Sequence, residues 1–233
     1  GSQPIELPMA PFDGSRVISS TEALALKEVP KHLVVVGGGY IGLELGSVWR
    51  RLGAVVTVIE ALPRIIANSD TSMSATIQRS LKKQGLVIKT STSLESVEFL
   101  PDRISVSTSC NELREEISCD CLLVAVGRKP NTQGLGLSAL GVDINPQGRI
   151  VVDRCYRQTV KGLYAIGDIV PGPMLAHKAS EEALICIERM MGNEIPDVAY
   201  QLIPGVVYTW PEGASVGATE EQLKASGCGY RKG

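Results

Sequence analysis

A buried strand that runs directly into a glycine-rich turn and then into a helix constrains this chain more than any other feature. Residues 33–36 form an unbroken β-branched and leucine run, three glycines follow, and residues 40–52 carry apolar side chains at helical spacing. In this context the pattern Gly37-x-Gly39-x-x-Gly42 predicts a dinucleotide-binding turn. Gly37 permits the tight turn, Gly39 lets backbone approach a diphosphate, and Gly42 lets the helix pack close to the strand. The helix start would then present N–H groups and a partial positive charge to the diphosphate.

The residue at the end of the second strand indicates which dinucleotide is bound. Glu60 ends the predicted strand 55–59 and follows Gly42 by 18 residues. A carboxylate there accepts hydrogen bonds from both adenosine-ribose hydroxyls and repels a 2′-phosphate, so the sequence favours NAD over NADP. Arg64, four residues further on, is the one residue nearby that offers an alternative contact for a 2′-phosphate.

The remaining periodicity predicts an α/β protein. The first part reads strand, helix, strand, helix, strand, which gives right-handed crossovers and a parallel sheet. Three short alternating segments then predict an antiparallel meander, and loop-rich chain follows. Predicted strands are 33–36, 55–59, 86–88, 93–100, 103–109, 113–119, 121–126, 150–152, 163–166 and 206–208, and predicted helices are 40–52, a segment from Asp70 or Ser72 to Gln84, 176–191 and 219–225.

Composition excludes several classes of protein. The net charge is −2, which is too little positive charge to hold a nucleic-acid backbone. No apolar run approaches the ~20 residues that a membrane helix needs, and no secretory signal is visible. Six cysteines occur without CxxC or CxxxxC spacing, and with two histidines we expect no metal site. Cys119 and Cys121 are expected on one face of a strand, as ordinary half-buried cysteines in a reducing compartment.

A second candidate contact follows the apolar stretch 164–166. Gly167-Asp168 ends this predicted strand, where an aspartate is placed to bond a ligand hydroxyl. A turn or helix-capping aspartate has the same local pattern, so the residues alone leave both interpretations open.

Three segments taken together resemble the flavin-dependent pyridine nucleotide–disulfide oxidoreductases. They are Val-Gly-Gly-Gly-Tyr-Ile-Gly-Leu-Glu-Leu-Gly at 36–46, Val-Gly-Arg-Lys-Pro-Asn at 126–131 and Tyr-Ala-Ile-Gly-Asp at 164–168. Pro-Met-Leu-Ala-His-Lys-Ala at 173–179 and Val-Tyr-Thr-Trp-Pro-Glu at 207–212 narrow the resemblance to the members that oxidise protein-bound dihydrolipoamide. The resemblance spans essentially the whole chain.

The resemblance implies a domain organisation. Residues 1–28 would connect from an FAD domain, and 29–127 would form a Rossmann-like NAD-binding domain with a parallel sheet plus the antiparallel meander. Residues 128–195 would be a partial central, FAD-contacting domain, and 196–233 the truncated start of an α+β dimerisation domain.

The resemblance also implies NAD and FAD as cofactors and assigns contacts to individual residues. The NAD contacts would be Gly37, Gly38, Gly39, Tyr40, Ile41, Gly42, Leu43, Glu44, Glu60, Leu94 and Gly127. The FAD contacts would be Asp168, Met174, Leu175, Ala176 and His177. Three of these have open alternatives: Tyr40 is a gating ring over the flavin or a packed aromatic, Glu44 faces the flavin and its partner lysine or is an exposed helix residue, and His177 contributes mainly through backbone or caps its helix.

The implied reaction passes electrons from a dithiol to a disulfide, to FAD and then to NAD. Implied partners are lipoyl domains of 2-oxoacid dehydrogenase or glycine-cleavage complexes and a second copy of the full-length protein, in the cytoplasm or the mitochondrial matrix. The family's reactive cysteine pair and its His–Glu acid–base pair have no counterpart here, so we expect no catalytic residue on this chain and no activity from it alone. Trp210 stands where many relatives have His, without a functional interpretation. Two alternatives to this function stay open. One is another reductase or NADH oxidase of the superfamily, and the other is a non-catalytic nucleotide-binding module.

Overall fold

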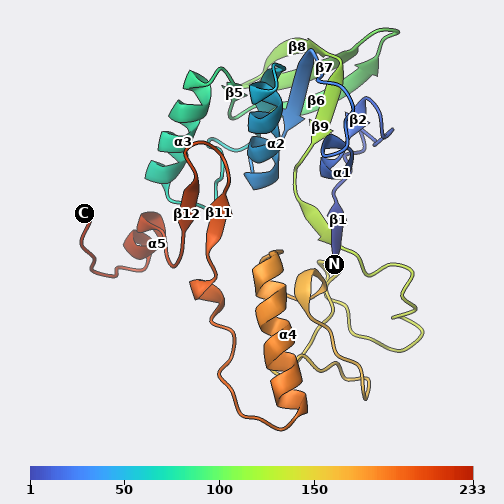
Figure 1. The fold of residues 1–233 in the computed structure, drawn as a ribbon, viewed down its shortest axis with the longest axis vertical. Coiled ribbons are helices and arrows are strands. Elements are labelled where there is room, and N and C mark those ends of the chain that lie inside the picture. The colour runs from blue at the N-terminus through green and yellow to red at the C-terminus, as the bar shows by residue number, and fades with distance from the viewer. Residues whose placement is uncertain (233) are drawn as a thin grey trace. The chain divides into compact units, whose positions relative to one another are not determined.

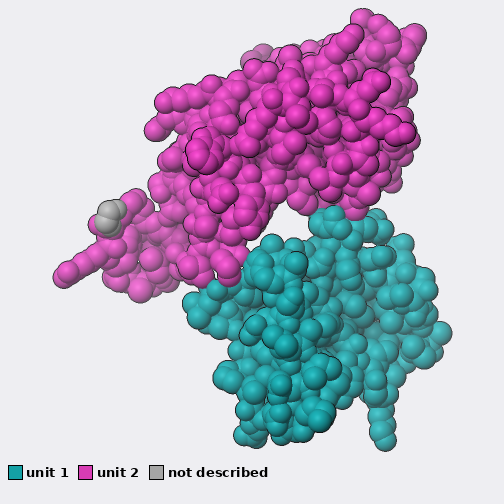
Figure 2. Space-filling model, viewed as in Figure 1, with its two compact units in different colours: residues 1–3, 128–203 teal, residues 4–127, 204–233 magenta. Residues whose placement is uncertain are grey.

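The chain forms two compact units in the computed structural model, which describes residues 1–232 (Figure 2). The larger unit comprises Pro4–Gly127 and Pro204–Gly233, and the smaller unit comprises Gly1–Gln3 and Arg128–Ile203. The domain boundaries given above stay a prediction.

A five-stranded parallel sheet is the centre of the larger unit. It contains β2 (Val17–Ile18), β9 (Cys121–Val124), β3 (His32–Val36), β4 (Val55–Ile59) and β5 (Val87–Lys89), in that spatial order. The predicted parallel pairing of the first three long strands is thereby confirmed, and β2 is a strand that the sequence analysis missed. β4 and β5 lie to one side of β3 and β9 lies to the other, so the strand order reverses at β3. Ligands of open α/β sheets bind outside the carboxyl ends of the strands at such a point.

Helices cover one face of this sheet and the antiparallel meander covers the other. Leu33 and Val35 of β3 share a core cluster with α2 (Tyr40–Arg51) and α3 (Thr71–Lys83). Val34 and Val36 point to the opposite face and share a cluster with β7 (Ile104–Cys110) and β8 (Leu113–Cys119). β6 (Ser93–Phe99) completes the meander (Figure 1). The alternation of β-strand side chains therefore explains why residues 33–36 are apolar without a break.

Two helix starts in the larger unit follow from local capping. Asp70 caps α3, because its Oδ1 accepts hydrogen bonds from the N–H and hydroxyl of Ser72. Thr219 and Gln222 form a capping box at the start of α5 (Glu220–Ala225), the helix predicted at 219–225. Between them along the chain, β11 (Gly205–Val207) and β12 (Gly213–Ser215) form a hairpin beside α2 and α3 (Figure 1).

The smaller unit differs from its sequence prediction. It contains β1 (Ser2–Pro4) paired with β10 (Arg128–Pro130), and α4 (Ala176–Met190) with two 3₁₀ turns, η1 (Gly167–Ile169) and η2 (Tyr200–Leu202). The short α1 (Ser20–Ala23) belongs to the larger unit. The predicted strands 150–152 and 163–166 are wrong. Each has a single isolated bridge, Ile150 to Ile144 and Tyr164 to Arg157, because no strand among residues 1–232 lies alongside to form a ladder.

The cysteine pair was also placed wrongly. Cys119 ends β8 and packs with the meander cluster, whereas Cys121 begins β9 and packs with the helix cluster. Asp120 separates the two strands, and its carboxylate accepts hydrogen bonds from the N–H groups of Lys31 and His32 at 2.7 and 2.6 Å. A single extended strand through both cysteines therefore does not exist, and the side chains diverge.

Candidate nucleotide-binding site

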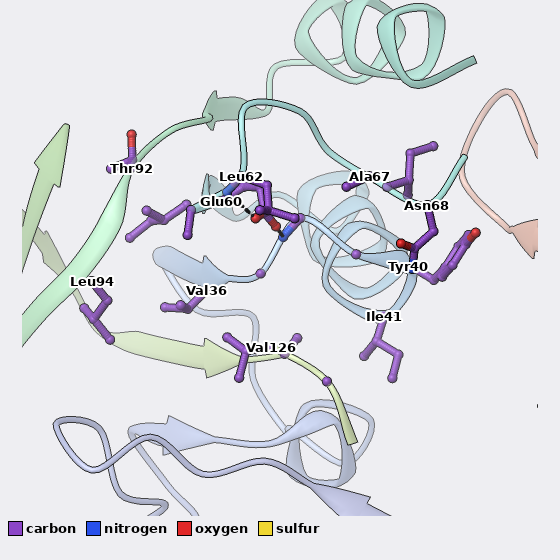
Figure 3. Close-up of a pocket in the computed structure, with 18 residues that line it drawn as sticks. Val36, Tyr40, Ile41, Glu60, Leu62, Ala67, Asn68, Thr92, Leu94 and Val126 are labelled. Carbon is purple, nitrogen blue, oxygen red and sulfur yellow. Dashed lines mark hydrogen bonds between the residues drawn. The ribbon is translucent and has the colours of Figure 1, made fainter. Parts of the chain in front are cut away.

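A cavity of about 480 Å³ opens at the carboxyl ends of β3, β4 and β9 (Figure 3). The predicted NAD contacts that line it are Gly37, Gly38, Gly39, Tyr40, Ile41, Glu60, Leu94 and Gly127. Its lining comprises Val36, Gly37, Gly38, Gly39, Tyr40, Ile41, Ile59, Glu60, Ala61, Leu62, Ile66, Ala67, Asn68, Thr92, Leu94, Ala125, Val126 and Gly127.

The glycine turn is shaped by three different requirements. Gly37 has φ +112°, and a Cβ there would overlap the carbonyl oxygen of Ala125. A Cβ on Gly42 would overlap the carbonyl oxygen of Gly37 and lie 3.1 Å from Val35 Cγ1. A Cβ on Gly39 would meet nothing within 4 Å, and no side chain caps α2, which starts at the next residue. The first two glycines are needed by the fold, while the space above Gly39 and the uncapped N–H groups suit a diphosphate.

The carboxylate of Glu60 is fixed at the cavity by the backbone. Its Oε2 accepts from the Gly38 N–H at 2.6 Å and its Oε1 accepts from the Leu62 N–H at 2.7 Å (Figure 3). Each oxygen keeps a second lone pair for a ligand hydroxyl. Arg64 does not line the cavity, because its Nη2 donates to the carbonyl oxygen of Ala67 at 2.7 Å.

The first turns of α2 place the other predicted contacts in different surroundings. Tyr40 and Ile41 line the cavity, and the Tyr40 hydroxyl lies 3.3 Å from Ser69 Oγ. Leu43 is fully buried in the helix-side core, away from the cavity lining. Glu44 Oε1 accepts from the Tyr208 N–H at 2.9 Å, which ties α2 to the β11–β12 hairpin.

Several lining residues carry no sequence signal. Asn68 lies in the loop between β4 and α3, and Thr92 precedes β6. Their common property is their place near the carboxyl edge of the sheet, so the strand order, once known, is the signal that would have found them.

The predicted FAD contacts lie in the smaller unit. Asp168 is in η1, where its Oδ2 accepts from the hydroxyl of Ser2 at 2.5 Å. Arg128 holds Ser2 in turn, through Nε to its hydroxyl at 2.7 Å and Nη2 to its carbonyl at 2.6 Å. Residues 174–177 lead into and begin α4, whose N-cap residue, Leu175, provides no side-chain cap.

Cys119 on β8 and Cys121 on β9 lie outside the cavity lining. Burial, followed by the nearby Asp120 carboxylate, raises the pKa of Cys119 to about 12, and burial likewise raises the pKa of Cys121 to about 12. Both are therefore neutral thiols at physiological pH. Across residues 1–232, all six cysteines are free, no group of three or more His, Cys, Asp or Glu side chains could hold a metal ion, and no helix is long and apolar enough to span a bilayer.

Comparison with known families identifies the class. The family model of the pyridine nucleotide-disulphide oxidoreductases matches residues 1–183, and the chain belongs to this family. The family resemblance and the α/β fold class expected from the sequence are thereby confirmed. Membership implies FAD and NAD(H) as cofactors.

Individual relatives point to one enzyme within the family. The chain is 48% identical to dihydrolipoyl dehydrogenase 3 of Pseudomonas putida, over all of this chain and 50% of that protein. It is 47% identical to the mitochondrial dihydrolipoyl dehydrogenase of Pisum sativum, over all of this chain and 47% of that protein. The crystal structure of LpdA from Mycobacterium tuberculosis has a TM-score of 0.88 at 27% identity, covering 97% of this chain and 49% of that one. The chain spans about half the length of the relatives it matches.

Proposed function

We propose that the chain is a segment of a dihydrolipoyl dehydrogenase and that its larger unit binds NAD. The observation that carries the NAD assignment is the Glu60 carboxylate, held at the cavity by two backbone N–H groups beside the open space above Gly39. The observation that carries the enzyme assignment is 45–48% identity over the whole chain to proteins with that activity.

Each part of the cavity has a role in this proposal. The Gly38 N–H already bonds Glu60, so the N–H groups of the first turn of α2 are the donors left for the diphosphate. Glu60 accepts from the adenosine-ribose hydroxyls and repels a 2′-phosphate. Leu94 forms a wall beside the adenine, and Gly127 brings backbone to the cofactor.

The smaller unit supplies contacts for FAD. Asp168 bonds the ribityl–phosphate region, and the N–H groups at the start of α4 run beside the pyrimidine edge, where they stabilise negative charge. FAD supplies the electron transfer between a dithiol and the nicotinamide, and these residues hold and orient it. The redox disulfide is not formed by Cys119 and Cys121, which stay protonated and belong to different core clusters.

The proposed reaction of the full-length protein is oxidation of protein-bound dihydrolipoamide with NAD, and its proposed partners are lipoyl domains and a second copy of itself. The relatives include a bacterial protein and mitochondrial ones, which correspond to the bacterial cytoplasm or the mitochondrial matrix. The alternative is another flavoprotein disulfide reductase, favoured by the similarity to the HOCl-induced reductase RclA of Escherichia coli at a TM-score of 0.87. Its identity is 29%, against 48% for the dihydrolipoyl dehydrogenase of Pseudomonas putida.

The coenzyme assignment is tested by Glu60→Gln, with Arg64→Ala as the matched control. Glu60→Gln keeps the size and one backbone acceptor but removes the charge, so the ratio of the NADPH and NADH dissociation constants should fall about tenfold, equivalent to about 1.4 kcal/mol. Arg64→Ala should leave the ratio unchanged, because its guanidinium bonds the loop rather than facing the cavity. Fluorescence titration measures both constants, and an unchanged ratio in Glu60→Gln would refute the assignment.

A further inference from the structure

The smaller unit contains a fully buried ion pair that the proposed binding contacts do not include. Lys178 and Glu182 lie one turn apart on α4, with Nζ and Oε1 3.0 Å apart and both side chains 0% exposed. Burying two charges costs more free energy than their attraction returns unless further hydrogen bonds satisfy them. The buried pair therefore depends on additional polar partners.

Those further hydrogen bonds converge on one residue. Lys178 Nζ donates to the Gly167 carbonyl at 2.8 Å, and Glu182 Oε2 accepts from the Gly167 N–H at 2.7 Å. The two charges of the pair therefore hold both polar backbone groups of the same residue. Gly167 is buried and has φ +78°, a conformation that favours glycine and turns the chain immediately before Asp168.

Tyrosine completes the arrangement around the acid. The hydroxyl of Tyr200 donates to Glu182 Oε1 at 2.6 Å, so Glu182 accepts from a lysine, a backbone N–H and a phenol at once. Burial, followed by the hydrogen bond to Glu182, raises the pKa of Tyr200 above its usual value and keeps this hydroxyl a donor. Both carboxylate oxygens of Glu182 therefore accept from protein donors.

Lys178 and Glu182, together with the backbone groups of Gly167 that they bond, form what we call the clamp. The clamp joins two segments that are predicted to touch the same cofactor. Lys178 is in the first turn of α4, whose start follows residues 174–175, and Gly167 precedes Asp168 in η1. We propose that Lys178 and Glu182 are positioning residues for FAD. They fix the Gly167–Asp168 turn against the first turn of α4, so that both segments can contact the flavin nucleotide at the same time. This inference rests on the proposed FAD binding of the smaller unit.

An apolar pair at positions 178 and 182 could not fix the backbone of Gly167. It would leave the buried N–H and carbonyl of Gly167 without partners, and the turn would rearrange to satisfy them. The effect of losing the clamp should therefore appear in the position of Asp168 and the start of α4, beyond any general loss of stability.

The test uses the full-length flavoprotein that contains this chain. Its variants are Lys178→Met, Glu182→Leu and the double variant, which leaves no unpaired buried charge and is expected to fold. Glu181→Gln, an exposed neighbour on α4, is the matched control. The readouts are the rate of FAD release, the reduction potential of the bound flavin, and amide hydrogen exchange at Gly167 and Asp168.

We expect the double variant to release FAD at least tenfold faster, with a more negative flavin potential and faster exchange at Gly167, while Glu181→Gln matches the wild type. A double variant with wild-type release, potential and exchange would overturn the positioning role, as would a loss of thermal stability with all three unchanged. A wild-type protein without flavin would instead overturn the proposed function and this role with it, so the two failures are distinguishable.

Discussion

Two alanine substitutions in the glycine turn should have opposite consequences. A Cβ on Gly42 would overlap the Gly37 carbonyl oxygen, which is backbone and cannot swing away, and would also press on Val35. A Cβ on Gly39 would enter open space, at a residue whose φ of −80° any amino acid adopts. Gly42→Ala should therefore damage the fold, and Gly39→Ala should damage ligand binding.

The magnitudes follow from the two environments. Overpacking costs ~1–3 kcal/mol, and the upper end applies at Gly42 because the obstructing atom is backbone. Alanine returns about 1 kcal/mol through its higher helix propensity, which leaves a net loss of about 2 kcal/mol. At Gly39, alanine is a poorer N-cap residue than glycine, which costs about 1 kcal/mol. This cost is offset by about 0.4–1 kcal/mol, because alanine lowers the conformational entropy of the unfolded chain. The stability of Gly39→Ala should stay near that of the wild type.

Urea denaturation and NADH titration together test this reasoning. Gly42→Ala should lower the denaturation midpoint with an unchanged slope, and Gly39→Ala should keep the midpoint while NADH affinity falls at least tenfold, because its methyl group occupies the diphosphate position. The reasoning fails if Gly42→Ala is as stable as the wild type, or if Gly39→Ala binds NADH normally.

Three further predictions concern acid, thiols and flavin. Several hydrogen bonds, the first from the Ser72 hydroxyl, lower the pKa of Asp70 to about 2. The ionised carboxylate therefore stabilises the fold fully above its unfolded pKa near 4, and this stabilisation is lost as pH falls toward 2. Thermal melts from pH 6 to 2 should show the loss, and Asp70→Asn should make the melting temperature less dependent on pH. Burial keeps Cys121 protonated, so iodoacetamide at pH 8 should modify exposed Cys228 much faster, as peptide mass spectrometry would show, and equal rates would contradict the burial. The chain expressed alone should elute from gel filtration without flavin absorbance, since Asp168 and the start of α4 are its only proposed FAD contacts; a yellow eluate would contradict this.

The larger unit was predictable because its signals are local. The run at 33–36, the glycines after it and the apolar period of 40–52 each require particular backbone geometry, and they agree with one another. The same holds for Asp70 and for the Thr219 capping box, whose partners lie two or three residues away. Glu60 was found because the end of a strand is itself readable from sequence.

The smaller unit was less predictable because its structure depends on non-local partners. The stretches 150–152 and 163–166 have the composition of strands, yet a strand needs a neighbour to supply its ladder. The clamp of Lys178 and Glu182 on Gly167 was invisible for a related reason. Charged residues four apart on a helix usually indicate a solvated face, and the structure alone shows that this pair is buried.

The position of Glu60 couples the proposed coenzyme specificity of the larger unit to the conformation of its glycine turn. The carboxylate that would select NAD also accepts the hydrogen bond of the buried Gly38 N–H inside the phosphate-binding turn. Replacing Glu60 by arginine to favour NADP would leave that N–H unpaired, at a cost of about 1–3 kcal/mol, while the exposed Leu62 N–H could turn to water. A change of charge at this position should therefore also disturb the turn proposed to hold the diphosphate, and a coenzyme switch would require a new acceptor for Gly38 together with the new cation.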